Sequence, residues 1–288
     1  MIEKVKRKSL IIRPSGRSTD FISPSFGHGC LYNCTYCYMK RHKPEGLSIA
    51  TNPLDILTEI DHHCWFIDVE KPNQTHEKYT TYDISCNEDF ALHLKYHDWK
   101  TIFTFFKDHP KAMGSFATKY VNKDLLEFYP EGKIRVRYSM MPEKYANILE
   151  PNTSTLVEKL MSTHELMARG YEVHLNFSPV IVTDGWLDEY RKLFELINRY
   201  CNVTDWARSH IKAEVIFLTH NEGKHVYNKM ENLPGEDLLW NPAIQEGKIS
   251  QYGGENIRYR HDLKAQYIKE WTELHDEIIP WNTIRYIF

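Results

Sequence analysis

The sequence predicts an α/β protein, specifically a partial (β/α)6 TIM-like barrel followed by a C-terminal extension. Apolar stretches of strand length alternate along the chain with longer stretches of helical periodicity, which is typical of parallel strands joined by crossover helices. About six such units fit into the chain, fewer than the eight of a complete barrel. Because the catalytic residues of barrels gather where the strands end, we expect the active site at the carboxyl edge of the sheet.

The composition excludes several classes of protein. Of the 288 residues, 42% are hydrophobic and 26% are charged, as in ordinary soluble proteins. No apolar run approaches the roughly 20 residues of a membrane span, and no apolar segment follows the basic N-terminus as in a secretory signal. Six cysteines, three of them clustered, indicate a metal protein in a reducing compartment, so we expect a cytoplasmic location. The net charge of −3 indicates no general basic face for DNA but is compatible with a local patch.

The N-terminal half begins with a basic arm over residues 1–20 and a short strand over 21–26 that leads into a cysteine-rich loop. Pro53 opens a helix at the position where proline costs least, and this helix ends near Cys64. The elements that follow are a surface excursion over 65–80, a strand over 81–85, a turn over 86–89, a helix over 98–108, a strand over 114–118 and a short helix over 122–128. Residues 133–139 alternate with period two, which predicts a strand with two distinct faces.

The C-terminal half continues the alternation. Thr155 and Glu158 form the reciprocal capping pattern of a helix start, and Gly170 ends that helix. The remaining elements are a strand over 172–179, a helix from about 185, a strand over 211–218, a helix over 221–230, a loop-rich excursion over 231–254, a helix over 262–277 and a closing strand over 283–287. We expect a single domain with its barrel core over 21–220 and the C-terminal extension over 221–288.

The chemistry of the chain centres on Cys30, Cys34 and Cys37, which are spaced C-x3-C-x2-C. Such a loop supplies three thiolates to one metal centre, whereas a [4Fe–4S] cluster usually takes four protein thiolates. One iron therefore remains open to a ligand that is not protein. The spacing is the motif of the radical SAM enzymes, in which S-adenosylmethionine chelates that iron, and an aromatic residue such as Tyr36 is usual before the third cysteine.

Two other interpretations of the cysteine loop remain open. A zinc site would need a fourth ligand, which His28 or His42 could supply. Disulfides are less favoured, because three cysteines within eight residues cannot all pair locally. Cys64 lies near a helix end and is expected to be a packed small residue rather than a ligand.

From the cysteine loop almost to the C-terminus, the chain resembles the spore photoproduct lyase family. The matching segments, in order, are the loop with Tyr36 and Tyr38, Tyr82-Asp-Ile-Ser-Cys86-Asn-Glu-Asp89, Phe116-Ala-Thr-Lys-Tyr120, Lys133-Ile-Arg-Val-Arg-Tyr-Ser139, Glu150-Pro-Asn-Thr153, Gly170-Tyr171, Ser178-Pro179 and Gly185-Trp186. The resemblance implies a barrel of the radical SAM type and the repair of a methylene-bridged thymine dimer in DNA.

The resemblance also implies a mechanism. The cluster held by the three cysteines cleaves S-adenosylmethionine to a 5′-deoxyadenosyl radical, which removes a hydrogen atom from the dimer. The bridge then breaks and leaves a thymine radical, to which the weak S–H bond of Cys86 gives a hydrogen atom. Tyr36 and Tyr38 are suited to relay a hydrogen atom back to the nucleoside. The alternative for Cys86 is a buried packing residue, the usual place of a free cysteine.

Other cofactor contacts are expected by the same resemblance. Lys119 matches a lysine that contacts the carboxylate of S-adenosylmethionine, although a surface lysine is the plain alternative. Ser139 and Tyr36 are further candidate contacts, and Asn87 and Asp89 are candidates for the amino end of the cofactor. The Gly253-Gly254-Glu255 segment is too far along the chain for that role and is expected to form a turn.

The substrate side is less well matched. Within 251–260, Arg258, Tyr259 and Arg260 are suited to phosphate contact and base stacking, but an ordinary polar loop is the alternative. The expected partners are DNA with a thymine photolesion and a reductant such as flavodoxin or ferredoxin, for a monomeric protein. Two other functions remain open: a radical SAM enzyme that modifies another base, nucleotide or substrate, and a non-catalytic metal-binding nucleic-acid protein.

Overall fold

The computed structural model describes residues 2–43, 46–201, 204–249 and 253–288. Contacts within the chain group it into two compact units. The first unit contains 1–31, 43–138 and 162–174, and the second contains 32–42, 139–161 and 175–288. We expected one barrel core followed by an extension, whereas the chain passes between the two units several times. One boundary lies inside the cysteine loop, so Cys30 belongs to the first unit, and Cys34 and Cys37 belong to the second.

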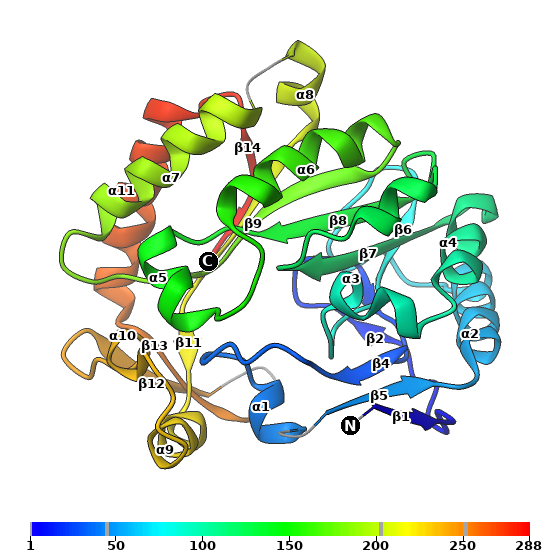
Figure 1. Ribbon diagram of the computed structural model, residues 1–288, viewed down its shortest axis with the longest axis horizontal. Coiled ribbons are helices and arrows are strands. Elements are labelled where there is room, and N and C mark those ends of the chain that lie inside the picture. The colour runs from blue at the N-terminus through cyan, green and yellow to red at the C-terminus, as the bar shows by residue number, and fades with distance from the viewer. Residues whose placement is uncertain (1, 44–45, 202–203, 250–252) are drawn as a thin grey trace. The chain divides into compact units, whose positions relative to one another are not determined.

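The first unit contains the N-terminal part of a parallel sheet. Its strand order is β8-β7-β6-β3-β2, with β2 antiparallel at the edge and the other strands parallel to one another. Helices α2 and α4 lie side by side, and α3 and α4 pack against β7 (Figure 1). The bounds are β2 (Arg13–Pro14), β3 (Phe21–Ile22), α2 (Pro53–Phe66), β6 (Thr80–Asp83), α3 (Phe90–His93), the 3-10 helix η1 (Leu94–Tyr96), α4 (Trp99–Asp108), β7 (Ala112–Thr118), the 3-10 helix η2 (Lys123–Glu127) and β8 (Ile134–Ser139).

A second sheet in the first unit corrects the expected N-terminal arm. Strand β1 (Ile2–Val5) pairs in parallel with β5 (Leu47–Ala50), which pairs in turn with β4 (Gly27–Gly29). The Arg7 guanidinium donates hydrogen bonds to the backbone oxygens of Ser25 and Ser48, at 3.0 and 2.8 Å. The side chains of β1 are exposed, as in a solvated arm, but their backbone pairs with a strand more than 40 residues away, which the charge pattern does not reveal.

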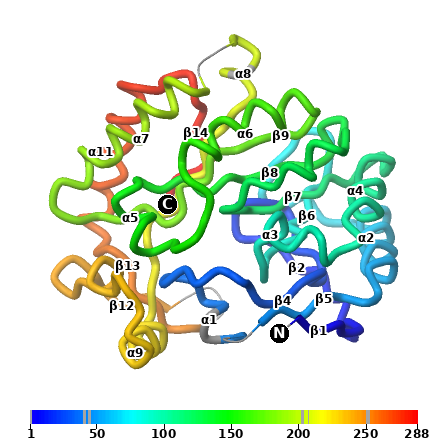
Figure 2. Tube along the Cα trace, viewed as in Figure 1, coloured from blue at the N-terminus to red at the C-terminus, as the bar shows by residue number. Residues whose placement is uncertain are grey.

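The second unit carries three strands of the parallel type in the order β9-β10-β14. The long helices α7 and α11 lie side by side (Figures 1 and 2). Between them Trp271 is fully buried, with its ring centroid 5.1 Å from that of Phe194. The bounds are α1 (Met39–His42), α5 (Glu143–Leu149), α6 (Leu156–Ala168), β9 (Glu172–Val180), α7 (Trp186–Cys201), α8 (Asp205–His210), β10 (Lys212–Phe217), α11 (His261–Ile278) and β14 (Thr283–Ile287), of which α6 and β9 extend into the first unit.

The loop-rich excursion expected over 231–254 contains regular structure, namely α10 (Glu236–Leu239) and β12 (Gln245–Ile249). Strand β12 pairs antiparallel with β13 (Glu255–Tyr259), which also pairs with β11 (Thr219–His220), and the helix expected over 221–230 is present as α9 (Glu222–Met230). Most of β12 is exposed, so it lacks the hydrophobic pattern by which a strand is detected in a sequence. Its pairing with β13 comes from backbone hydrogen bonds rather than from burial.

Strand β8 differs from its expected two-faced character, because all six of its residues are buried. Arg135 contacts Glu172 at 3.0 Å, and Arg137 contacts Asp83 at 2.7 Å, so ion pairs accompany the burial of both charges. The strand expected over 21–26 is also corrected, because β3 ends at Ile22 and the strand that leads into the cysteine loop is β4. The reciprocal cap is confirmed at α6, where the Thr155 N–H donates to the Glu158 carboxylate at 2.7 Å.

Within the described part of the chain, no helix combines the length and the apolar character needed to cross a lipid bilayer.

Candidate functional site

The cysteine loop joins the end of β4 to the start of α1. Cys34 is buried and Cys30 and Cys37 are partly exposed, and none of the six cysteines, all of which lie within the described residues, is in a disulfide. The disulfide interpretation is therefore wrong. The Cys37 N–H donates to the Cys34 carbonyl at 3.0 Å, which closes a turn between these two ligand candidates. Three thiols on one tight loop are the donor type that an iron–sulfur centre takes.

Tyr36, inside this turn, is held by a buried acid. Its hydroxyl donates to the carboxylate of Glu150, the residue that ends α5. Burial, and then the negative charge of Glu150, raise the pKa of Tyr36 well above its ordinary value, so its O–H keeps its hydrogen at neutral pH. Tyr38 is 39% exposed and its ring lies against His42. The two tyrosines expected to relay hydrogen therefore have different surroundings.

In the first unit, Cys86 lies in the turn between β6 and α3 and is partly exposed. Asp83, the last residue of β6, fixes this turn: it accepts from the Ser85 N–H at 2.9 Å and from Arg137 at 2.7 Å. On the other side of Cys86, Asn87 donates to the Ser25 hydroxyl at 2.6 Å. Hydrogen bonds on both sides of Cys86 thus give its thiol a defined place at the carboxyl end of a parallel strand.

Both carboxylate oxygens of Asp89 accept hydrogen bonds from other residues of the protein. One carboxylate oxygen accepts from the Leu92 N–H at 3.1 Å and from the Thr118 hydroxyl at 2.6 Å. The other oxygen accepts from the Lys119 N–H at 2.8 Å. Asp89 therefore caps α3 and holds the end of β7, which places Lys119 just beyond that strand. Contact of Asp89 or Asn87 with a cofactor stays a prediction.

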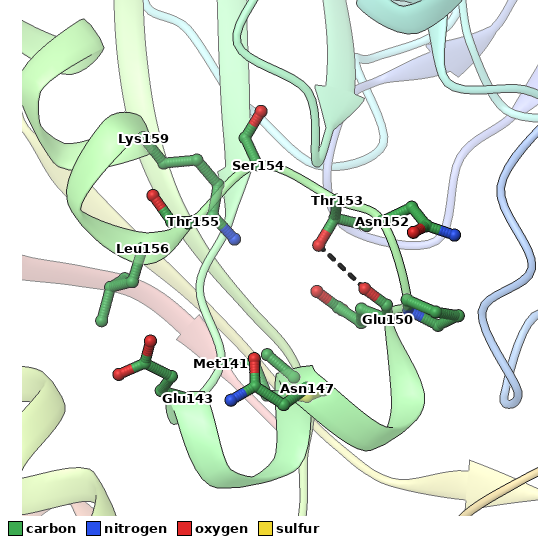
Figure 3. Close-up of a pocket in the computed structure, with 12 residues that line it drawn as sticks. Met141, Glu143, Asn147, Glu150, Asn152, Thr153, Ser154, Thr155, Leu156 and Lys159 are labelled. Carbon is green, nitrogen blue, oxygen red and sulfur yellow. Dashed lines mark hydrogen bonds between the residues drawn. The ribbon is translucent and has the colours of Figure 1, made fainter.

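Ser139 ends β8 and is buried, and its carbonyl accepts from the Lys159 ammonium at 2.7 Å. Glu150 and Lys159 also line a cavity of about 110 Å³ at the C-terminus of α5 and the start of α6 (Figure 3). Ligand pockets usually measure about 300–1,000 Å³, so this cavity is too small for a nucleoside cofactor. It is occupied at one edge by Thr153, whose hydroxyl donates to the Glu150 carbonyl at 3.0 Å.

The three C-terminal candidates for DNA contact, Arg258, Tyr259 and Arg260, differ in their exposure and partners. Tyr259 is 1% exposed and its hydroxyl accepts from the Val182 N–H at 2.9 Å, so its ring has no free face for stacking on a base. That part of the expected DNA contact is corrected. Arg258 pairs with Glu246 at 3.1 Å, whereas the Arg260 side chain is 46% exposed.

The other predictions for this region can be stated briefly. Gly253 lies in a bend before β13, with φ of +79°, whereas Glu255 of the expected turn is the first residue of β13. Gln251 and Tyr252 of the polar segment lie outside the described residues. Away from the site, Cys64 and Cys201 are buried, so the packing role predicted for Cys64 is confirmed.

The sequence does not reveal the buried charged residues around the candidate site. Glu88 lies between the two candidates Asn87 and Asp89, and its side chain is fully buried between two histidines. For Arg137 the sequence predicts only a place in a strand. A charged residue inside an otherwise apolar strand or turn can indicate a buried ion pair, but only when its partner is known.

An α/β fold with a thiol beyond the end of the parallel strand β6, in a chain that also carries a three-cysteine loop, is that of a radical SAM protein. The family model for spore photoproduct lyase matches residues 4–288. This chain belongs to the spore photoproduct lyase family, as the sequence motifs predicted. The family's cofactors are a [4Fe–4S] cluster and S-adenosylmethionine.

Relatives and solved structures agree with this assignment. The chain is 27% identical to the spore photoproduct lyase of Bacillus subtilis over 286 residues, which cover 97% of this chain and 80% of the relative. It is 27% identical to that of a Geobacillus species, over 92% of this chain and 75% of the relative. A solved spore photoproduct lyase complexed with dinucleoside spore photoproduct superposes with a TM-score of 0.88 at 21% identity, covering 100% of this chain and 82% of that chain. This likeness confirms the partial barrel.

Proposed function

We propose that this protein is a radical SAM lyase that reverses a methylene-bridged thymine dimer in DNA. The observation that carries the proposal is Cys86, a thiol held at the carboxyl end of β6 in a chain that also has the three-cysteine loop. Most radical SAM reactions need no such second thiol, whereas quenching of a thymine radical does. Support comes from solved relatives that carry dinucleoside spore photoproduct and, in one variant, S-adenosylmethionine as well.

The proposed roles follow from the chemistry of each side chain. When bound, the cluster and S-adenosylmethionine supply the radical that takes a hydrogen atom from the substrate. Cys30, Cys34 and Cys37 would hold the cluster, and Lys119 would pair with the carboxylate of the cofactor, with Ser139 and Asn87 as further contacts. The Cys86 S–H bond breaks as a C–H bond forms on thymine, which leaves a sulfur radical.

The sulfur radical must recover a hydrogen atom before the next cycle. The Tyr36 O–H, kept protonated by burial and by Glu150, suits that donation. Tyr38 would then restore the hydrogen atom of Tyr36 and take one in turn from the nucleoside. The protein thus ends each cycle with every side chain restored, and the cofactor is regenerated rather than consumed.

The direct test is anaerobic incubation of reduced, reconstituted protein with S-adenosylmethionine and dinucleoside spore photoproduct, followed by mass analysis of the nucleosides. We expect two intact thymidines, and none when S-adenosylmethionine is omitted. Formation of 5′-deoxyadenosine without loss of the photoproduct would instead identify a radical SAM enzyme for another substrate. A protein that binds zinc and no iron would be the non-catalytic alternative.

We also propose that Arg260 contacts the DNA backbone, because it is the most exposed of the three C-terminal candidates. Affinity for duplex DNA is expected to fall steeply as salt rises, and Arg260→Ala to reduce the slope of log affinity against log salt by about one. Lys269→Ala, an exposed cation on α11, is the matched control. A slope unchanged by Arg260→Ala in fluorescence-anisotropy titrations would remove this contact.

A further inference from the structure

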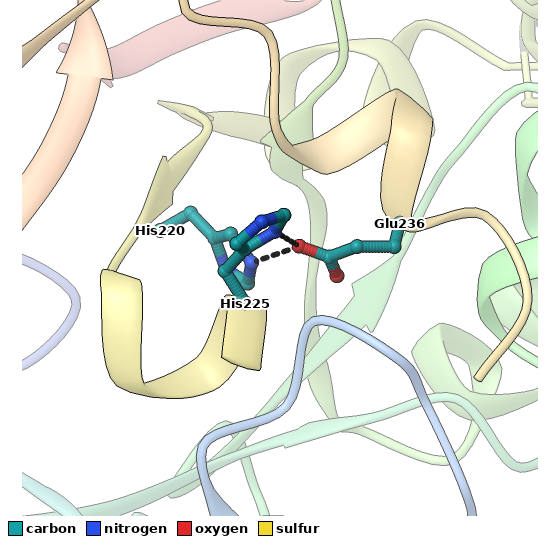
Figure 4. Close-up of side chains that lie close together, drawn as sticks. All are labelled: His220, His225 and Glu236. Atoms are coloured by element: carbon teal, nitrogen blue, oxygen red, sulfur yellow. Dashed lines mark hydrogen bonds and ion pairs between the residues drawn. The ribbon is translucent and has the colours of Figure 1, made fainter. Parts of the chain in front are cut away.

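Two carboxylates have no role in the proposed chemistry, and each accepts hydrogen bonds from two histidines. The side chain of Glu88 is fully buried and that of Glu236 is 11% exposed. Glu88 accepts from His93 and His97 in the first unit. Glu236 accepts from His220 and His225 in the second unit (Figure 4). Burying a carboxylate is costly unless donors surround it. We call Glu88 with His93 and His97 the Glu88 cluster, and Glu236 with His220 and His225 the Glu236 cluster. The residues to which each cluster is hydrogen-bonded indicate its role.

The Glu88 side chain is fully buried, and one of its oxygens lies 3.0 Å from Nδ1 of His93 and 2.9 Å from Nε2 of His97. Burial alone would raise the pKa of Glu88, but His97 and His93 outweigh it and lower the pKa to about 2. Glu88 is therefore a carboxylate at neutral pH. A Cβ at Gly27 would lie 2.2 Å from this carboxylate, so only glycine leaves room for it beside β4.

The Glu88 cluster is hydrogen-bonded to the backbone next to Cys30. Because Nδ1 of His93 donates to Glu88, its Nε2 carries a lone pair, and this atom accepts the N–H of Leu31 at 3.3 Å. On the other side of Cys30, the N–H of Gly29 donates to the carbonyl of Asn87 at 3.0 Å. Glu88 thus fixes the histidine tautomer that holds Leu31. The turn that carries Glu88 also carries Cys86.

The Glu236 cluster is linked by hydrogen bonds to Thr35, in the part of the cysteine loop that carries Cys34 and Cys37. One oxygen of Glu236 accepts from His220 at 2.9 Å and from His225 at 2.6 Å, and the other accepts from the Asn228 amide at 2.5 Å. The second N–H of that amide donates to the carbonyl of Thr35 at 3.1 Å. Asn228 is 2% exposed, so few alternative partners reach it.

Thr35 lies between Cys34 and Tyr36 and is held at every polar atom. Its N–H donates to the Leu149 carbonyl and its hydroxyl to the Pro234 carbonyl, both at 2.9 Å. The bond from Asn228 completes the set by satisfying its carbonyl. The backbone between the second and third cysteines is therefore fixed by the segment that Glu236 organises.

A metal ion is the other interpretation of His220, His225 and Glu236, whose ligand atoms lie within 4.8 Å of one another. Ligands about 2.0–2.1 Å from a tetrahedral zinc are about 3.3 Å apart, whereas the two histidines contact Glu236 at 2.9 and 2.6 Å. Nδ1 of His220 has no hydrogen-bond partner, although a ligating histidine normally donates its other ring N–H. The geometry fits a hydrogen-bonded carboxylate better than a metal site.

We propose that Glu88 and Glu236 are positioning residues, each of which holds the part of the cysteine loop in its own unit so that the loop's thiolates are set for a cluster. The proposal rests on the proposed function, because it takes the iron–sulfur cluster as the group that the loop receives. Glu88 has the additional role of linking the backbone around Cys30 to the turn that carries Cys86.

The test compares Glu88→Leu and Glu236→Gln after anaerobic reconstitution. Both histidines contact one oxygen of Glu88, so a glutamine could still accept from them, whereas leucine removes the acceptor. Both oxygens of Glu236 accept hydrogen bonds, so a glutamine amide there opposes a histidine or Asn228. We expect the rate of iron release to an external chelator to rise several-fold in both variants. Glu127→Leu and Glu222→Gln, exposed acids in the first and second units, are matched controls expected to release iron like the unmodified protein.

Asn228→Ala separates positioning from folding, because it removes the bond to Thr35 and leaves both histidines on Glu236. Because loss of this buried amide also lowers stability, iron release is measured at a temperature at which circular dichroism shows the apo-protein of both forms to be folded, and it should be faster in the variant. Unchanged iron release in Asn228→Ala and Glu88→Leu would overturn the proposal. So would one equivalent of zinc in the isolated protein that Glu236→Gln loses. If the unmodified protein bound no iron, the proposed function itself would fail.

Discussion

Replacement of Cys30, Cys34 or Cys37 by alanine is expected to abolish the visible absorption of the iron–sulfur cluster and all cleavage of S-adenosylmethionine. The loop offers three thiolates, and a cluster that must also leave one iron open has no spare protein ligand. Loss of one thiolate therefore removes the centre that delivers the electron. The measurement is iron and sulfide content with the absorption spectrum after anaerobic reconstitution, and 5′-deoxyadenosine formation under reducing conditions.

Two cysteines of the same chain serve as controls for these variants. Cys64 and Cys201 are buried, and burial raises the pKa of the Cys201 thiol to about 12, which leaves it inert. Cys64→Ala and Cys201→Ala should keep the cluster and full cofactor cleavage, with a stability loss of about 1 kcal/mol. Full activity in an alanine variant at 30, 34 or 37 would contradict the assignment of that residue as a ligand.

Cys86→Ala is expected to change the products and leave the first steps intact. The thiol acts after the substrate bond has broken, so the variant should still form 5′-deoxyadenosine and still consume the photoproduct. Without a hydrogen donor the thymine radical reacts with other reagents in the buffer. The nucleosides should then include thymine adducts in place of two intact thymidines, as detected by mass spectrometry.

The same variant should also change how much cofactor is used. With no sulfur radical to accept a hydrogen atom from Tyr36, the nucleoside radical is not regenerated, and one S-adenosylmethionine is consumed for each photoproduct opened. The ratio of 5′-deoxyadenosine to consumed substrate measures this directly, with Cys201→Ala as the reference. Wild-type products together with wild-type cofactor use would make Cys86 a structural residue and remove the main support for the repair function.

These two experiments also separate the repair lyase from the other functions that the sequence left open. Failure of the cluster variants to lose iron would point to another metal ligand set, and a colourless zinc protein would point to the non-catalytic class. A Cys86 variant that behaves normally in a protein with an intact cluster would leave the radical chemistry in place but move the substrate away from a thymine dimer. The chemistry and the substrate are therefore tested independently.

Sequence patterns that depend on neighbouring residues predicted local structure well. The helix that opens at Pro53 and the cap of Thr155 and Glu158 are both present. Each follows from the backbone geometry or hydrogen bonding of residues a few positions apart. The spacing of the three cysteines is information of the same kind, and it was sufficient to predict the radical SAM family before any tertiary contact was known.

Partners that are distant in the sequence could not be predicted in this way. Arg137 meets Asp83 across 54 positions, and Asn228 meets Thr35 across 193. The local sequence around Tyr259, between two arginines, indicated an exposed DNA contact, but packing in the second unit buries its ring. Burial and pairing of this kind depend on which elements the whole fold brings together.

The sequence by itself determined the alternation of strands and helices in the main sheet, the family and the residues able to carry radical chemistry, because spacing along the chain is enough to define a ligand loop or a helix cap. Only the tertiary structure decided how those residues are held. Glu88 and Glu236 are unremarkable acids in the sequence, and they gain a role because folding surrounds each with two histidines. A charge inside a protein is stable only with its donors in place, and those donors come from distinct segments of the chain.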